Sequence, residues 1–597
     1  MSAEAPFDVV IVGAGVAGAL IADRLTGAGL RVQVLEAGPD TARSFDGYTQ
    51  NLQQFYAAFA KGPESPWTPA KAAPQPDTGD LRTQTGYFVQ RGPQLYGSSY
   101  TRRWGGSTLH WLGVSLRMLP EDFRMRSRHG VARDWPLDYD ALAPHYERAE
   151  HMLGVSADVA DQAYLGVTFR DGYEYPMHRV PPSYSDQALA DAVDGMEVTL
   201  GGERATLKVR SYPAARNSTP REGYAPQGAV DIHADGRPMD RFVGERCAGN
   251  TACTPICPIQ ARYHAGKTLA HAIQGGLTVL AQAVASKILV DPADGSVQGI
   301  EYKRYDDPNA VTPAFTTHVA KARVYILTSH AVENAKLMLA SGLTGRGGTV
   351  GANLMDHPAL YAWGLAPSPV GPFRGPLSTS GIEDCRGGAF RARHAAFRYD
   401  VGNDGWKPAT GAPDATVADA VKQGLFGGRL RDALATTLTR QVRLSLAVEQ
   451  LPDPANRVSV DPAHIDAIGN PVPVIQYRID DYTLAGMAKA AEVCRAMFQR
   501  AGITDCTGQG EAWFPPVSYL DQTFRYHGMG HFAGTHAMGD DPAQSVVDPD
   551  QRAWDHRNLF VVGSGSFPTM GTSNPTLTLA ALALRTADRL LASLQAA

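Results

Sequence analysis

Three glycines near the N-terminus are the first residues whose spacing could do chemistry. Gly13, Gly15 and Gly18 fit the G-x-G-x-x-G pattern of dinucleotide sites. Gly13 permits a tight turn, Gly15 lets the backbone approach a pyrophosphate, and Gly18 allows close helix–strand packing. Glu36, roughly 20 residues further on, can accept hydroxyls of an unphosphorylated ribose. The pattern therefore predicts FAD or NAD and disfavours NADP.

A second glycine turn lies near the C-terminus. A strand is expected over 558–562 and leads into Gly563, and an apolar helix is expected to begin at Pro575 and Thr576. The positive end of such a helix can stabilise negative charge on a reduced flavin. We therefore expect Gly563 and Thr576 to contact the cofactor.

Three of the six cysteines lie close together, at Cys247, Cys253 and Cys257. Thiolates suit zinc or iron–sulfur sites. The spacing is wide for structural zinc, which needs four ligands, although His264 could supply a fourth. The final Cys-Pro is typical of iron–sulfur loops. The chemistry favours iron–sulfur over zinc, and three unligated buried cysteines are the remaining alternative.

The elements that must position these residues can also be predicted. The apolar run 8–12 indicates a parallel strand buried on both faces, followed by a helix over 17–25 and a strand over 31–36. Further strands are expected at 277–280, 287–290 and 324–327 and within 444–479, and an amphipathic helix at 482–502. Segment 47–100 is interpreted as a surface excursion and 184–240 as a turn-rich region. Segment 364–428 is rich in Gly and Pro, and its structure is left open.

Composition excludes several classes of protein. The 597 residues carry 55 Lys and Arg against 60 Asp and Glu, a net charge of −5, which argues against a nucleic-acid binder. With 44% hydrophobic residues, the chain can bury a large core and is not disordered. Six cysteines, three of them crowded together, are too few and too uneven for a disulfide scaffold. We find neither a signal peptide nor a membrane-spanning run, so contact with a membrane is expected only through a partner.

Taken together, the motifs resemble those of the glucose–methanol–choline (GMC) family of flavin oxidoreductases. The resemblance covers nearly the whole chain. It rests on the glycine motif with Glu36, on the segments 104–111, 134–136 and 350–358, and on His531 with the segment 571–577. The cysteine cluster makes the chain most similar to bacterial FAD and iron–sulfur dehydrogenases of sugars and sugar acids, such as those of glucose, gluconate, fructose and sorbitol.

The resemblance implies an α/β fold with two domains. A Rossmann-like FAD-binding (GMC) domain would comprise residues 1–45, 90–150, 245–360 and 530–597. An α+β substrate domain with an antiparallel sheet and surface insertions would comprise 151–244 and 361–529. An iron–sulfur loop would lie at 247–257.

The resemblance also implies a catalytic pair. Alcohol oxidation by a flavin requires a base for the hydroxyl proton and a hydride acceptor at flavin N5. His531 matches the family's base, and Asn574 matches the partner that orients the alcohol oxygen. We interpret His536 as a competing but secondary histidine, and His357 as structural.

Further flavin contacts are implied in the segment that begins with two glycines. These contacts are Gly105, Gly106, Ser107 and His110. The matching histidine of pyranose oxidases carries a covalent flavin bond, whereas that of the dehydrogenases generally does not, so the bond is left open here.

The cysteines, on this resemblance, hold a 3Fe-4S cluster that passes electrons onward from FAD. Cys247, Cys253 and Cys257 would be its ligands, although the subgroup usually has a second cysteine where this chain has Ala248. One alternative is a pyranose-oxidase-like enzyme that uses oxygen. Another is a non-catalytic redox or assembly subunit.

The implied partners are a small-molecule sugar or polyol, a small export or chaperone subunit, and a cytochrome c subunit. The implied location is the periplasmic face of the inner membrane, reached through a partner subunit, with the cytoplasm as the alternative.

Overall fold

The computed structural model describes residues 7–44, 46–50, 53, 88–98, 100–228, 243–247, 256–308, 310, 312–373, 378–406, 414–508 and 515–595. The predicted surface excursion over 47–100 lies mostly outside these ranges, as does Cys253 with most of the predicted iron–sulfur loop.

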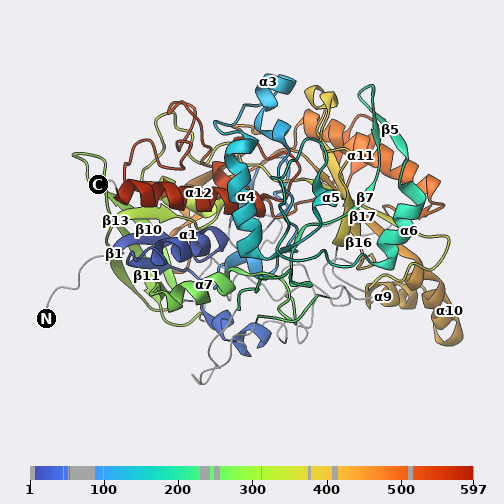
Figure 1. The fold of residues 1–597 in the computed structure, drawn as a ribbon, viewed down its shortest axis with the longest axis horizontal. Coiled ribbons are helices and arrows are strands. Elements are labelled where there is room, and N and C mark those ends of the chain that lie inside the picture. Colours follow the sequence, from blue (N-terminus) through green and yellow to red (C-terminus); the bar gives the residue numbers. More distant parts are fainter. Residues whose placement is uncertain are drawn as a thin grey trace.

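A five-stranded parallel sheet takes strands from both ends of the chain (Figure 1). Its order is β24 (Leu559–Val561), β13 (Ala322–Leu327), β1 (Phe7–Val12), β2 (Val32–Leu35) and β9 (Thr278–Leu280). In the central strand β1, Val9 and Ile11 are buried in one apolar cluster, and Val10 and Val12 in another. Because both faces of β1 are covered, the strand is apolar throughout.

Helices from distant parts of the chain pack around this sheet. Helix α1 (Val16–Thr26) follows β1 directly and packs against α7 (Ala265–Gln274) and α12 (Pro575–Gln595). Helix α12 also packs along α4 (Tyr139–Leu153). Blue α1 and red α12 lie side by side in Figure 1. The start of the chain and its end therefore build one region.

A second, antiparallel sheet lies on the other side of the molecule (Figure 1). Its order is β20 (Thr504–Asp505), β14 (Ala359–Leu365), β17 (Gln441–Val448), β16 (Phe397–Gly402), β15 (Ser378–Ile382) and β7 (Val209–Ser211), with β23 (Tyr526–His527) also paired to β14. Helix α11 (Asp481–Arg500) packs against β14, β16 and β17. The sheet can therefore present its opposite face to a ligand.

The other described elements form smaller units. Two three-stranded sheets contain β10 (Ala283–Val290), β11 (Val297–Tyr305) and β12 (Phe315–Ala320), and β18 (Arg457–Ile465), β19 (Pro471–Gln476) and β3 (Val89–Arg91). The remaining helices are α3 (Met125–His129), α5 (Val159–Gln162), α6 (Tyr184–Val193), α8 (Ala331–Ala340), α9 (Asp414–Lys422) and α10 (Gly427–Thr437). The remaining strands are β4 (Val155–Ser156), β5 (Glu197–Leu200), β6 (Glu203–Thr206), β8 (Ala214–Ala215), β21 (Val517–Tyr519) and β22 (Gln522–Phe524).

The turn-rich interpretation of 184–240 is wrong for its first part, where α6 forms. The Ser183 hydroxyl accepts the Asp186 N–H at 3.2 Å, and the Asp186 carboxylate accepts the Ser183 N–H at 2.7 Å. This reciprocal cap satisfies two backbone donors at the helix start. Segment 364–428, whose structure the sequence left open, contains β15, β16 and α9.

Across the described ranges, none of the helices combines the length and apolar character that crossing a bilayer would require.

Candidate active site

A cavity of about 430 Å³ extends from the carboxyl ends of β1 and β2 to the antiparallel sheet. Ten of the site residues predicted from the sequence line it: Gly13, Gly15, Glu36, Gly106, Ser107, His110, His531, Gly563, Asn574 and Thr576. Ligands of open α/β folds bind at this end of the strands.

The glycine turn between β1 and α1 has the shape that a dinucleotide requires. Gly13 has φ +103°, a left-handed conformation that favours glycine. A Cβ on Gly18 would lie 2.1 Å from the Gly13 carbonyl oxygen, so only glycine at position 18 allows α1 to pack this closely against the turn. A Cβ on Gly15 would meet no atom within 4 Å. The backbone at Gly15 is therefore open to a pyrophosphate at the N-terminus of α1.

Glu36 stands at the end of β2 and braces the glycine turn. Its carboxylate accepts the N–H of Ala14 at 2.9 Å and that of Gly38 at 2.8 Å. Burial raises the pKa of Glu36 to about 7. The carboxyl group lines the cavity and is placed to meet a ribose.

The predicted flavin-contact segment packs against the glycine turn. A Cβ on Gly106 would lie 3.3 Å from the Gly15 Cα, whereas one on Gly105 would lie 3.4 Å from the Gly266 nitrogen of α7. Gly105 therefore allows this segment to pack closely against α7. Gly106, Ser107 and His110 face the cavity. Burial lowers the pKa of His110 to about 4.

The C-terminal turn closes the opposite side of the cavity. Gly563 has φ +130°, and a Cβ there would meet nothing within 4 Å. Helix α12 begins at Pro575, so Thr576 lies in its first turn and faces the cavity. These features together fit FAD: the open glycine turns at Gly15 and Gly563, the carboxyl group of Glu36, and the N-termini of α1 and α12.

Substitutions at two glycines should separate folding from cofactor binding. Gly18→Ala should lower the free energy of unfolding by about 1–3 kcal/mol, because its methyl overlaps the Gly13 carbonyl. Gly15→Ala should change that free energy by less than about 1 kcal/mol. It should nevertheless weaken FAD binding by about tenfold or more, because its methyl occupies the pyrophosphate approach. Denaturant melts and FAD titrations measure both, and equal FAD affinity in Gly15→Ala would contradict this placement.

The predicted catalytic pair meets at the cavity wall. His531 Nε2 lies 3.2 Å from Asn574 Nδ2. Arg398 donates through Nη2 to Asn574 Oδ1 at 2.9 Å and through Nε to the Thr572 carbonyl at 2.8 Å. Because the guanidinium takes the amide oxygen, Asn574 turns its NH₂ group toward His531. His536, the competing histidine, instead lies 3.3 Å from Asn334 Nδ2.

A histidine interpreted as structural from the sequence fixes the protonation of His531. His357 Nε2 lies 2.8 Å from the Gly571 carbonyl oxygen, which can only accept, so Nε2 carries the proton. Burial lowers the pKa of His357 to about 3, so the ring is neutral and its Nδ1 is an acceptor. That Nδ1 lies 2.7 Å from His531 Nδ1. His531 must therefore be the donor through Nδ1.

His531 consequently presents an unprotonated Nε2 at the cavity wall. Its own burial, with His357 and Arg398 nearby, holds the pKa of His531 well below its ordinary value and keeps the ring neutral. The only ring proton is on Nδ1, so the Nε2 lone pair accepts from the Asn574 NH₂ group here and can accept from a substrate hydroxyl in its place. This is the arrangement that a general base needs.

The pH profile should reflect this lowered pKa. A base must be unprotonated to act, so a depressed pKa moves the acid limb of kcat/KM to lower pH. We expect kcat/KM to stay level from pH 8 down to 6.5, the ordinary pKa of histidine, and to fall only well below it. Initial rates between pH 5 and 8 test this, and an acid limb centred at 6.5 or above would contradict a neutral His531.

One face of the antiparallel sheet forms the polar floor of the cavity. Tyr361 of β14 pairs with Ser445 of β17, which pairs with Asp400 of β16, and all three line the cavity. Arg443 and Ser378 line it as well. Sequence reasoning missed these residues. The available signal was the alternation of polar and apolar residues over 441–446, which is typical of a sheet with one polar face.

Two of the three predicted cluster ligands lie in one small buried group. Cys247 and Cys257 are buried together with Val180 and Ala261. Among the described residues no set of three metal-ligating side chains is found, and Cys253 lies outside them. His264, the possible fourth ligand, is buried and stacks on Tyr48, whose hydroxyl donates to the Cys257 carbonyl at 3.0 Å.

Comparison with known proteins establishes the family. A family model described as GMC oxidoreductase matches residues 8–359 with its N-terminal part and 452–583 with its C-terminal part. The chain belongs to the GMC oxidoreductase family. It is 30% identical to the fructose dehydrogenase large subunit of Gluconobacter japonicus over 602 residues, covering 98% of both chains.

Two further matches agree with this assignment. The chain is 27% identical to paromamine 6'-oxidase of Streptomyces fradiae, covering 97% of this chain and 90% of that protein. The structure of pyridoxine 4-oxidase from Mesorbium loti has a TM-score of 0.57 at 18% identity, covering 98% and 99% of the two chains, a likeness of fold. The predicted family, fold class and enzyme class are confirmed: this GMC oxidoreductase is an FAD-dependent enzyme that acts on alcohol groups.

Proposed function

We propose that this GMC oxidoreductase oxidises an alcohol group of a sugar, polyol or sugar acid and passes the electrons to an external acceptor. The observation that carries the proposal is the unprotonated His531 Nε2, held beside Asn574 above a floor of hydroxyl and charged groups. Bound FAD would supply the hydride acceptor for the carbinol carbon.

The residues at the cavity wall have separate roles in the proposed oxidation. His531 Nε2 takes the hydroxyl proton, and the Asn574 NH₂ group donates to the alcohol oxygen. Arg398 fixes the amide, and His357 fixes the imidazole, so neither group has to reorient during the reaction.

The polar floor supports a polyhydroxylated substrate. Ser445, Asp400 and Ser378 line the cavity with hydroxyl and carboxylate oxygens, which can exchange hydrogen bonds with several hydroxyls of one substrate. The likeness to the fructose dehydrogenase large subunit points to the same class of substrate.

We further propose that Cys247, Cys253 and Cys257 hold a 3Fe-4S cluster that accepts electrons one at a time. The burial of Cys247 and Cys257 in one group supports it. The segment that follows Cys257 packs on the flavin-contact segment: the Ala265 N–H donates to the Thr108 hydroxyl at 2.9 Å, and Arg262 donates to the Leu109 carbonyl at 2.6 Å. A cluster there would adjoin the flavin side of the cavity.

Cys253→Ser should separate the two half-reactions. We expect the variant to lose iron and acid-labile sulfide and to keep reduction of FAD by substrate. We also expect it to lose transfer to cytochrome c. Metal analysis, electron paramagnetic resonance and cytochrome reduction measure these, with Cys385→Ser, at another buried cysteine, as control. Cytochrome reduction that survives loss of the cluster would refute the relay.

The partners and the location are proposed with the same function. The name "large subunit" of the fructose dehydrogenase relative supports a multi-subunit assembly. We propose a small export or chaperone subunit and a cytochrome c subunit, which would hold the enzyme at the periplasmic face of the inner membrane, with the cytoplasm as the alternative. Co-purification after co-expression with neighbouring genes tests this.

A substrate panel tests the function itself. Purified enzyme loaded with FAD should reduce an artificial dye with at least one sugar, polyol or sugar acid, and release little peroxide under air. The likeness to paromamine 6'-oxidase favours the second candidate, an oxidase. Stoichiometric peroxide would establish that alternative, and no turnover with any polyhydroxylated compound would refute the proposal.

A further inference from the structure

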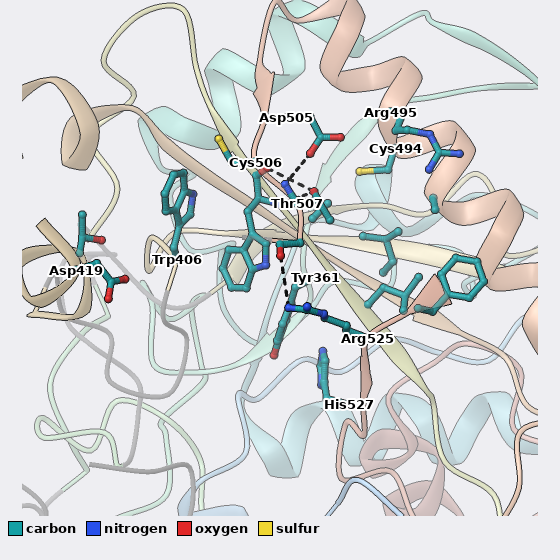
Figure 2. Close-up of a pocket in the computed structure, with 18 of the residues that line it drawn as sticks. Tyr361, Trp406, Asp419, Cys494, Arg495, Asp505, Cys506, Thr507, Arg525 and His527 are labelled. Atoms are coloured by element: carbon teal, nitrogen blue, oxygen red, sulfur yellow. Dashed lines mark hydrogen bonds between the residues drawn. The ribbon is translucent and has the colours of Figure 1, made fainter. Parts of the chain in front are cut away.

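A second, larger cavity adjoins the active site. Its volume is about 930 Å³, and it lies between β14 and the helices α9, α10 and α11 (Figure 2). Pockets for small ligands range from about 300 to 1,000 Å³, so this one is large enough for a ligand of its own. In Figure 2, Trp406 and Asp419 lie on one side of it and Cys494 and Arg495 on the other.

Two aromatic side chains line both cavities. Tyr361 and His527 line both of them, and their rings stack with centroids 3.9 Å apart and planes at 21°. Figure 2 shows the Tyr361 and His527 side chains close to each other. A molecule that extends out of the flavin cavity past this pair would enter the larger one.

The aromatic surface continues beyond that pair. Trp363 lies two residues after Tyr361 on β14, so both side chains point to the same face of the sheet, and their ring centroids are 5.2 Å apart. Trp406 donates through Nε1 to the Gly364 carbonyl at 3.2 Å, which fixes its indole beside the strand. All three rings line the larger cavity.

The charges around the larger cavity are balanced. Asp419 and Asp505 are matched by Arg495 and Arg525, and all four are exposed. A strongly charged ligand would gain little from such a mixed rim. Flat aromatic surfaces with separate donors and acceptors suit an uncharged ligand that has apolar faces and polar edges, which describes a sugar ring.

We propose that the larger cavity is a second sugar subsite, which holds the distal ring of a glycoside or oligosaccharide while the first ring is oxidised in the flavin cavity. The inference rests on the proposed function and names its substrate class more narrowly. The enzyme would therefore prefer a disaccharide to the monosaccharide that it contains.

Trp406→Ala tests the subsite, with Trp554→Ala as the matched control. Trp554 is also a half-buried tryptophan with a bonded Nε1, which donates to Ser545 at 3.0 Å, and it lines neither cavity. The measurement is kcat/KM for a disaccharide divided by kcat/KM for its oxidised monosaccharide. The loss of one stacking ring should lower this ratio roughly three- to tenfold in Trp406→Ala, mainly through KM, and leave it unchanged in Trp554→Ala.

Binding without turnover gives a second readout. Calorimetry of the disaccharide with FAD-loaded His531→Ala enzyme should show affinity that falls by a similar factor when Trp406→Ala is added. If no sugar is oxidised by the wild type but this binding persists, the proposed function fails and the subsite stands.

Three results would overturn the subsite. They are an unchanged ratio in Trp406→Ala, an equal loss in Trp554→Ala, and slower oxidation of the reduced enzyme by a quinone in Trp406→Ala with sugar kinetics unaltered. The last result would assign the cavity to the electron acceptor.

Discussion

His531→Ala should lower kcat by about 10²–10⁴-fold while the protein retains FAD. The variant removes the imidazole that lies beside Asn574 and is placed to take the hydroxyl proton, and water in its place is a much weaker base. The FAD-contact residues at the glycine turns are untouched, so the yellow colour and the absorbance ratio of flavin to protein should match the wild type. Dye-coupled initial rates and flavin content measure both effects.

His536→Ala is the control for this prediction. It removes a second buried histidine of the same segment, which packs near Asn334, so it should affect stability more than turnover. Turnover like that of the wild type in His531→Ala, or its abolition by His536→Ala alone in a folded, FAD-loaded protein, would show that the base has been misassigned.

His357→Leu should lower kcat by about 10²–10³-fold, although His357 lies behind His531 and is fully buried. Leucine cannot accept the His531 Nδ1 proton, so the proton is free to move to Nε2, where it blocks base catalysis. In serine proteases, the loss of the group that fixes the catalytic tautomer lowers kcat by about 10⁴-fold, and we expect a smaller effect from a neutral partner such as His357. KM and FAD content should change far less, because the His357 ring contacts His531 and not the ligand.

His357→Gln distinguishes positioning from packing. Its amide can donate to the Gly571 carbonyl and accept from His531 Nδ1, so we expect kcat within about tenfold of the wild type, with the acid limb still well below pH 6.5. Equal losses in the Leu and Gln variants, with equal losses of stability, would show that His357 only fills space.

The nucleotide half of the fold was predictable because local sequence determines it. The run 8–12, the glycine turn and Glu36 belong to one continuous βαβ unit, and the structure places β1, α1 and β2 within a residue or two of the predicted bounds. Motifs of this kind carry their geometry in their own spacing.

The substrate half was less predictable because its contacts are distant in sequence. Tyr361, Ser445 and Asp400 form one row only through strand pairing across β14, β17 and β16. Strand register depends on packing and turns far from the residues concerned. The alternation in β17 was visible in the sequence, but its partners were not.

His357 shows the same limit at the active site itself. Its motif suggested a structural role, and nothing in the sequence places its Nδ1 against His531, 174 residues away. Only the folded chain reveals that the Gly571 carbonyl fixes the tautomer of His357, and that His357 in turn fixes the tautomer of His531.

The most direct test of the account is anaerobic single-turnover reduction of FAD by a saturating sugar, followed as loss of oxidised-flavin absorbance. We predict rapid bleaching in the wild type, slowed at least about 100-fold in His531→Ala and restored in part by exogenous imidazole. An oxidised spectrum that persists in the wild type with every sugar, or bleaching at equal rates in both proteins, would contradict it.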